Sequence, residues 1–114
     1  MYDKKLFPQD LAIERFIFAI EQGFYVEAHE LLEEDWKAFK KLGEKKKAKA
    51  LQGLINGATA LALFHIKKRP EGYKKVWPVY EKYKYLFEEI TLENIEKYHH
   101  ACKVLERINN EISF

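Results

Sequence analysis

Apolar residues recur every three or four positions through most of this chain, and glycine or proline separates the runs. That spacing places apolar side chains on one face of a helix, whereas a half-buried strand requires strict alternation. No segment combines alternation with enrichment in β-branched residues. The sequence therefore predicts an all-α fold, a compact bundle of about five helices that forms a single domain over residues 1–114.

The boundaries of the predicted helices follow from proline and glycine positions. Pro78 lies inside the fourth helix and is expected to kink or split it, and Thr91 is expected to act as the N-cap of the fifth. The predicted helices start near Pro8 and end at Gly23, then run over about 24–42, 45–68 and 70–90, and from Thr91 toward the C-terminus.

The third predicted helix is apolar on nearly all sides, which is typical of a central helix. Within it, Gly53, Gly57 and Ala60 form a strip of small residues. A glycine inside a helix costs about 1 kcal/mol relative to alanine, so two of them need a packing reason. We expect this strip to let a neighbouring core helix approach closely.

Charge and composition restrict the class of protein. The net charge of +2 is too small to indicate nucleic-acid binding by itself, so we do not expect a nucleic-acid partner. The single Cys102 excludes an intrachain disulfide. The longest uncharged stretch, residues 50–66, contains polar side chains and is short for a membrane span. Residues 1–7 contain no apolar signal region, so we expect a cytoplasmic protein. The excess of Lys and Glu over Gln and Asn is typical of hyperthermophiles.

Aromatic residues make up 15% of the chain, which is more aromatic area than a bundle of this size must bury. Large exposed apolar patches are rare on monomers. We therefore expect self-association through the fourth and fifth helices, with a homo-oligomer as the product. The aromatic residues that support this prediction are Phe64, Trp77, Tyr80, Tyr83, Tyr85 and Phe87.

Polar residues lie next to the apolar stripes of the second and third helices. His29, Glu33 and Trp36 share one flank of the second helix. Gln52, Asn56 and Thr59 form a stripe along the third helix, with Asn56 one turn after Gln52. Buried amides without partners cost about 1–3 kcal/mol each, so the two stripes are expected to face each other and enclose a polar pocket. Asp35 falls within the apolar stripe and needs a cation, a hydroxyl group or water beside it.

The segments G-F-Y-V-E-A-H-E-L-L-E-E-D-W (residues 23–36) and L-Q-G-L-I-N-G-A (residues 51–58) resemble the domain-of-unknown-function family numbered 309. The resemblance extends over about residues 16–76, includes His65 and the run 68–72, and stops after Pro78. It implies a small all-helical bundle found in prokaryotes and plastids, and it brings no established activity. The residues that match the family motif are Glu27, His29, Glu30, Glu33, Trp36 and Gln52.

Three interpretations of this polar cluster follow. It can be a satisfied buried network that fixes the pairing of two helices. It can hold a metal, with His65 or Glu30 joining His29 and Glu33, although the usual metal-binding spacings are missing. It can perform acid–base catalysis through His29 and Glu33. We expect a binding or interaction module that takes a small polar ligand and needs no cofactor, with a small hydrolase-like enzyme as the alternative.

Overall fold

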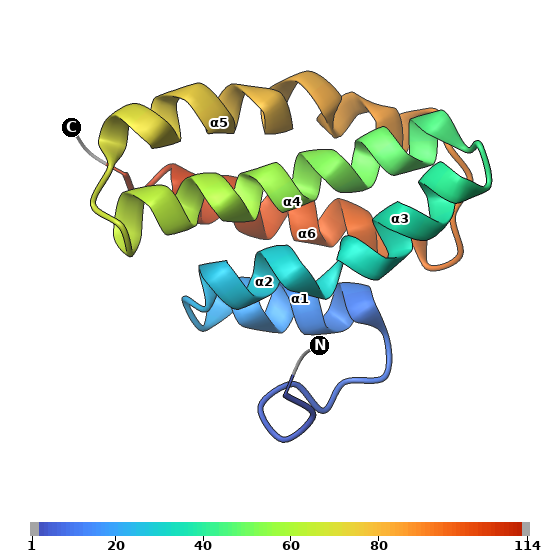
Figure 1. Cartoon of the computed structure of the whole chain (residues 1–114), viewed down its shortest axis with the longest axis horizontal. Helices are drawn as coiled ribbons and strands as arrows, with labels where there is room; N and C mark the ends of the chain where they lie inside the picture. The colour runs from blue at the N-terminus through green and yellow to red at the C-terminus, as the bar shows by residue number, and fades with distance from the viewer. Residues whose placement is uncertain (1–2, 113–114) are drawn as a thin grey trace.

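The computed structural model describes residues 3–112 and shows an all-α fold, as the sequence predicts (Figure 1). The predicted domain of residues 1–114 includes residues 1–2 and 113–114, which lie outside the described range. Within that range there are six α-helices, one 3₁₀ helix and no strand. The elements are α1 (Ala12–Glu21), α2 (Tyr25–Leu31), α3 (Glu33–Lys41), α4 (Lys45–His65), α5 (Pro70–Tyr83), η1 (Lys84–Glu88) and α6 (Ile95–Asn109).

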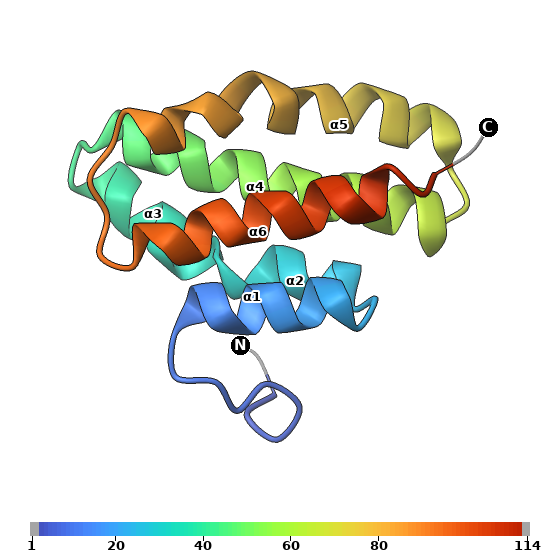
Figure 2. The ribbon, with the colours of Figure 1, turned by 180° about the vertical axis from the view of Figure 1, so that it is seen from behind.

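Helix α4 is central, in agreement with the prediction for the third helix. It packs against α2, α3, α5, α6 and η1. Figure 1 shows α5 running along one side of α4 with α2 and α3 on the other, and Figure 2, seen from behind, shows α6 running along α4 on the face that is hidden in Figure 1. Leu51, Leu54 and Leu61 of α4 are fully buried in the core that these helices share. No helix between residues 3 and 112 has the length and apolarity that crossing a membrane requires.

The glycine strip has the packing role predicted for it. A Cβ atom added to Gly53 would lie 3.1 Å from the Cβ atom of Tyr83 on α5. A Cβ atom added to Gly57 would lie 3.0 Å from a methyl group of Leu105 on α6 and 3.4 Å from the Tyr80 ring. The absence of side chains at these two positions lets α5 and α6 approach the backbone of α4.

The predicted helix over residues 24–42 is wrong in one respect, because the chain forms two helices with a break at Leu32. Leu32 has φ −105° and ψ −1°, and its side chain is fully buried. The neighbouring Leu31 is also buried. Adjacent residues of a straight helix point about 100° apart. The break allows both leucines to enter the core, and Asp35, in the first turn of α3, is half-buried.

The first helix begins at Ala12, four residues after the predicted start at Pro8. The Arg15 guanidinium donates hydrogen bonds to the carbonyl groups of Gln9 and Asp10, at 2.7 and 2.9 Å. The Glu14 carboxylate accepts a hydrogen bond from the Leu11 N–H at 3.2 Å. These contacts hold the preceding segment outside the helix and explain the later start.

Two expectations about the C-terminal half are also corrected. Helix α5 is not split at Pro78 and continues to Tyr83, because Trp77 and Tyr80 are buried while Pro78 lies on the exposed face. Thr91 is not an N-cap. Helix α6 begins after Asn94, which adopts a left-handed conformation (φ 62°) that asparagine tolerates better than most residues.

The aromatic residues of α5 and η1 fill the core instead of forming a surface. Trp77, Tyr80 and Phe87 are buried, and the Tyr80 hydroxyl donates to a Glu106 carboxylate oxygen at 2.6 Å. Phe64 and Tyr83 are half-buried, so Tyr85, at 54% exposure, is the exposed member of the predicted set. The exposed aromatic patch from which self-association was expected is therefore not present in the described residues, because α5 packs along α4 and buries most of these side chains. The oligomeric state itself stays a prediction.

Candidate binding groove

A groove of about 280 Å³ lies between α4 and the pair α2–α3. Helices α2 and α3 contribute His29, Glu33 and Trp36, and α4 contributes Gln52 and Asn56. The structure thus brings together five of the seven residues that the sequence singled out. Ile55 and Thr59 complete the lining, and Thr59 belongs to the polar stripe predicted on the same helix.

His29 and Glu33 contact each other across the helix break. The Nε2 atom of His29 lies 3.2 Å from a carboxylate oxygen of Glu33. The other ring nitrogen, Nδ1, lies 3.3 Å from the carbonyl oxygen of Val26. Both imidazole nitrogens therefore face oxygen atoms of this chain, which fixes the orientation of the ring at one end of the groove.

The prediction of a satisfied buried network is wrong. No polar or charged residue in the described part of the chain is buried, and the His29 side chain is 39% exposed. Within residues 3–112 the side-chain amides of Gln52 and Asn56 have no hydrogen-bond partner, whereas the Thr59 hydroxyl donates to the carbonyl of Ile55 at 2.9 Å. The cluster is open because α2 and α3 flank α4 and do not cover it, so its amides face solvent.

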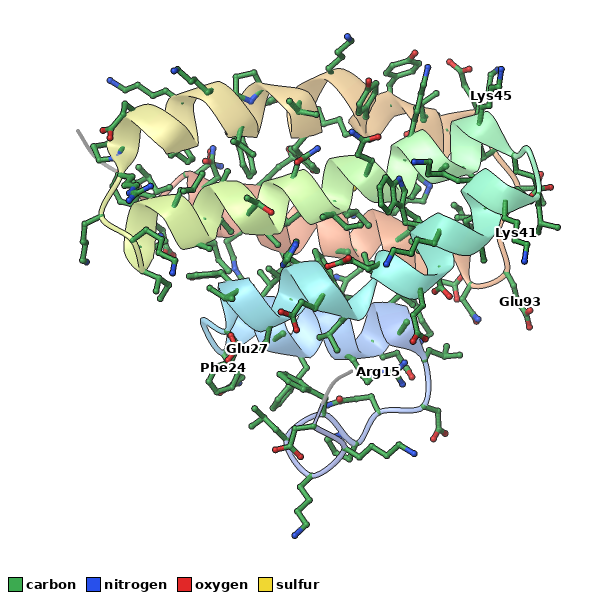
Figure 3. All side chains as sticks on the ribbon, viewed as in Figure 1. Arg15, Phe24, Glu27, Lys41, Lys45 and Glu93 are labelled. Carbon is green, nitrogen blue, oxygen red and sulfur yellow. The ribbon has the colours of Figure 1, made fainter. Side chains whose placement is uncertain are left out.

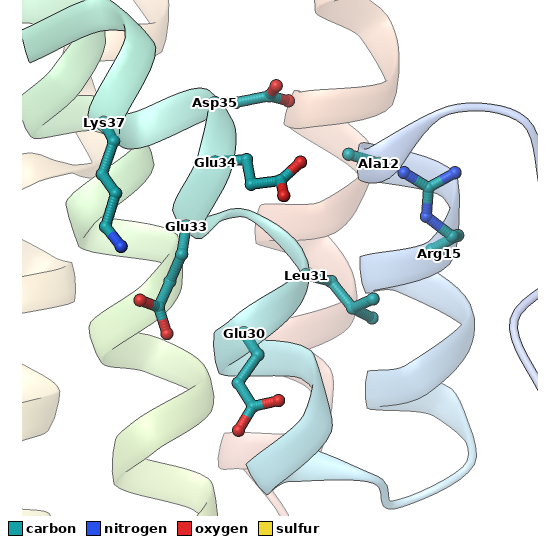
Figure 4. Close-up of a pocket in the computed structure, with 8 residues that line it drawn as sticks. All are labelled: Ala12, Arg15, Glu30, Leu31, Glu33, Glu34, Asp35 and Lys37. Carbon is teal, nitrogen blue, oxygen red and sulfur yellow. The ribbon is translucent and has the colours of Figure 1, made fainter. Parts of the chain in front are cut away.

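Glu27 and Glu30 lie outside this groove. Glu27 is exposed on α2, and Glu30 lines a second hollow of about 350 Å³ between α1 and the α2–α3 pair (Figure 4). This hollow is not predictable from a single helix over residues 24–42, because it forms where α2 and α3 meet at an angle beside α1. The four acidic residues within positions 30–35 were the available signal. The second hollow is lined by Ala12, Arg15, Glu30, Leu31, Glu33, Glu34, Asp35 and Lys37.

Asp35 occupies the interior side of this second hollow. Figure 4 shows its carboxyl group and that of Glu34 directed toward α1, the helix that carries Arg15. Burial raises the pKa of Asp35, while the positive charge of Arg15 acts in the opposite direction and the negative charge of Glu34 adds to the rise. Burial, with a smaller contribution from the negative charge of Asp35, raises the pKa of Tyr98 to about 12. The carboxylate is therefore less stable here than in water.

Replacement of Asp35 by asparagine is expected to raise the melting temperature at pH 7 by about 2–5 °C. Because the folded-state pKa is raised, the folded protein binds the proton more tightly, and stability is lost as the pH rises and Asp35 ionises. The difference between Asp35→Asn and the parent protein should disappear below about pH 3, where both states of the parent are protonated. Thermal melts from pH 2.5 to 8 measure it, with the exposed Asp10→Asn as control. A gain that persists at pH 2.5 would contradict this explanation.

The structure gives His29 and Glu33 no third metal ligand from the candidates. Between residues 3 and 112, no three His, Cys, Asp or Glu side chains are grouped so that they could hold one ion. His65, a candidate third ligand, lies in the last turn of α4 and stacks on Tyr25 with ring centroids 5.3 Å apart. Burial lowers the pKa of His65, and its Nε2 atom is buried without a partner in the described region.

Sequence comparison places the chain in a family. The model of the family described as "Domain of unknown function (DUF309)" matches residues 13–76, more than half of the chain. The chain belongs to the DUF309 family. Comparison with curated proteins and with solved structures finds no match.

The DUF309 match runs from α1 into α5. It therefore contains the helix break at Leu32, the glycines of α4 and every residue that lines the groove. Helix α6 lies beyond it, and α6 contributes to the core through Leu105 but lines neither hollow. The part of the chain that the family shares is the part that forms the groove.

Cys102 lies outside the DUF309 match, on α6. Burial raises the pKa of its thiol to about 11. Because the thiolate is the reactive form, we expect iodoacetamide to alkylate Cys102 at pH 8 roughly 100-fold more slowly than it alkylates a free thiol. Mass spectrometry over time measures the rate, and unfolding in guanidinium should restore fast addition of one label. Fast labelling of the folded protein would show that the thiol is not held in the core.

Proposed function

We propose that this DUF309 protein is a binding module that holds a polar ligand in the groove between α4 and α2–α3. The observation that supports the proposal is the pair of amides, Gln52 and Asn56, which line a concave site and have no partner in the described structure. Each amide offers both donors and an acceptor. A ligand that enters must satisfy them, because an amide left unpaired on binding costs about 1–3 kcal/mol.

Trp36 supplies the apolar surface of the proposed site. The ammonium group of Lys40 lies 4.4 Å from the centroid of its ring, which steadies the indole by a cation–π contact. An indole is large and loses little conformational freedom on binding, so it suits the wall of a binding site. The ligand would therefore contact Trp36 and bond to the two amides and the His29–Glu33 pair.

Acid–base catalysis by His29 and Glu33 has weaker support. A general base needs a ring nitrogen directed at the substrate. Both nitrogens of His29 face oxygens of the chain, Glu33 at 3.2 Å and Val26 at 3.3 Å. The contact is better suited to presenting a fixed polar surface than to moving a proton.

Nuclear magnetic resonance tests the proposal. A ¹⁵N-labelled sample is titrated with a library of small amide- and hydroxyl-bearing fragments, and the two tryptophan indole signals are compared. Fragments should shift the signals of the Trp36 indole and the Asn56 amide. The indole of Trp77, which is buried and donates to Glu81 at 2.9 Å, serves as an internal control. If no fragment at millimolar concentration shifts the Trp36 indole, the proposal is wrong.

A His29→Ala variant separates the proposed binding role from a structural role. Because the side chain is 39% exposed and its contact with Glu33 is an exposed pair, its removal should lower the free energy of unfolding by less than about 1 kcal/mol. Fragment binding should weaken. Urea unfolding and the same titration give the two values. A stability loss of several kcal/mol with unchanged binding would assign His29 a structural role.

A further inference from the structure

The groove is the middle part of a longer channel along one face of α4. Toward the start of α4 it adjoins a hollow of about 270 Å³, with which it shares Trp36 and Gln52. Toward the end of α4 it adjoins a hollow of about 170 Å³, with which it shares His29 and Thr59. The three hollows therefore follow one another along α4, and we call this row of hollows the channel. Any ligand of the middle hollow lies beside both ends.

The length of the channel indicates the size of its ligand. It follows α4 from Lys45 to Leu63. With a rise of about 1.5 Å per residue, that part of the helix is about 27 Å long. An extended chain covers about 3.3 Å per residue, so about eight residues of a peptide match the channel. A single small molecule would fill one hollow of the three.

The two ends of the channel differ in chemistry. Three lysines line the first end: Lys40, Lys45 and Lys49. Figure 3 shows Lys45 at the start of α4, where the chain enters this helix from α3. Lys45 and Lys49 form no ion pair within residues 3–112, whereas their neighbours Lys46 and Lys47 pair with Glu89 and Glu44.

The other end of the channel is apolar. Tyr25 and Val26 of α2 and Ala62 and Leu63 of α4 line it, and Val26 is 37% exposed. Lys67 at its edge is the charged residue of this hollow. An aliphatic or aromatic side chain of a ligand would bury its surface there, with a gain of about 25 cal/mol per Å².

The middle of the channel determines the backbone conformation of the ligand. Gln52 and Asn56 are one turn apart on α4 and have unpaired amides. A helical ligand already pairs its own N–H and C=O groups, whereas an extended peptide leaves them free. The side-chain amides of Gln52 and Asn56 can therefore form hydrogen bonds with the free N–H and C=O groups of an extended segment.

We infer that the channel binds an extended segment of a partner protein, with acidic side chains against Lys40, Lys45 and Lys49, backbone bonds to Gln52 and Asn56, and an apolar side chain against Tyr25, Val26 and Leu63. This inference rests on the proposed function and extends it from one hollow to three. Carboxylates complement the unpaired lysines, and their attraction also speeds association.

Selection from a phage-displayed library of random octapeptides, on the full chain in 150 mM NaCl, tests the inference. Selected peptides should carry Glu or Asp separated by about four to six positions from Leu, Ile, Phe or Tyr. Fluorescence anisotropy with the corresponding synthetic peptides then measures affinity. The Lys45→Glu/Lys49→Glu variant should bind at least 10-fold more weakly and, in a new selection, should prefer peptides with Lys or Arg. Circular dichroism checks that each variant is folded.

The matched control is Lys75→Glu/Lys103→Glu, which changes the charge by the same amount on exposed positions of α5 and α6 that do not line the channel. Its affinity should equal that of the parent. Selected peptides without acidic residues, equal weakening by both double variants, or no selected peptide would overturn the inference. Binding of a single-stranded 20-nucleotide DNA that Lys45→Glu/Lys49→Glu abolishes would replace the peptide by a nucleic acid. If fragments shift the Trp36 indole but no peptide binds, the proposed function stands and this inference fails.

Discussion

Gly53→Val is expected to lower the free energy of unfolding by about 1–3 kcal/mol, because the added side chain enters a helix contact with no room for it. A Cβ atom at this position lies 3.1 Å from the Cβ atom of Tyr83, which is fixed to the backbone of α5. The neighbour cannot rotate away, so the two helices must separate. Urea unfolding followed by circular dichroism measures the change. A loss of this size is a large part of the 5–15 kcal/mol typical of a small domain.

Lys49→Val is the control for this prediction. It introduces the same β-branched residue one turn earlier in α4, on an exposed position. Its effect reports the helix propensity of valine without the steric contact. If Gly53→Val and Lys49→Val have equal free energies of unfolding, the close approach of α5 is not the reason for a glycine at position 53. The channel lies on another face of α4, so ligand binding by the folded fraction of Gly53→Val should be unchanged.

Asn56→Leu is expected to weaken binding of the strongest NMR fragment by at least about 10-fold, since a lost or unpaired hydrogen bond in a bound complex costs about 1–3 kcal/mol. Leucine has a similar volume, and the amide it replaces has no partner in the described structure. The melting temperature should therefore change little. Titration of the Trp36 indole signal gives the affinity.

Thr59→Val provides a control within the same groove. The hydroxyl of Thr59 is already bonded to the carbonyl of Ile55, so its removal should change fragment affinity less than twofold. Equal loss in Asn56→Leu and Thr59→Val would indicate a general disturbance of the groove. Unchanged affinity in Asn56→Leu would remove the amides from the proposed site.

Much of the fold follows from local signals in the sequence. Gly23 and Gly43 adopt positive φ values of 82° and 76° where predicted helices end, and Pro70 opens α5. These residues act through their own backbone, so their effect is visible without knowledge of their neighbours. The break at Leu32 has no such signal, because it arises from the burial of two adjacent leucines in the assembled core.

The composition of the groove could be predicted, but its depth could not. Helical periodicity gives the direction of a side chain, which is why His29, Glu33, Trp36, Gln52 and Asn56 were expected on facing stripes. Exposure depends on what covers those stripes, and α2 and α3 are too short to do so. The aromatic residues were expected at the surface, but Trp77 and Tyr80 are buried. Their burial depends on where α5 packs in the assembled fold, and no local pattern in the sequence indicates that.

The two glycines that bring α5 and α6 against α4 also bear on recognition. Because Tyr83, Tyr80 and Leu105 pack against one side of α4, the backbone of this helix is held in place when a molecule binds. Recognition along the opposite surface would therefore follow a lock-and-key course, with little entropy lost from ordering this helix. Loosening this packing at Gly57 should therefore weaken binding, because part of the binding free energy would then be used to order α4.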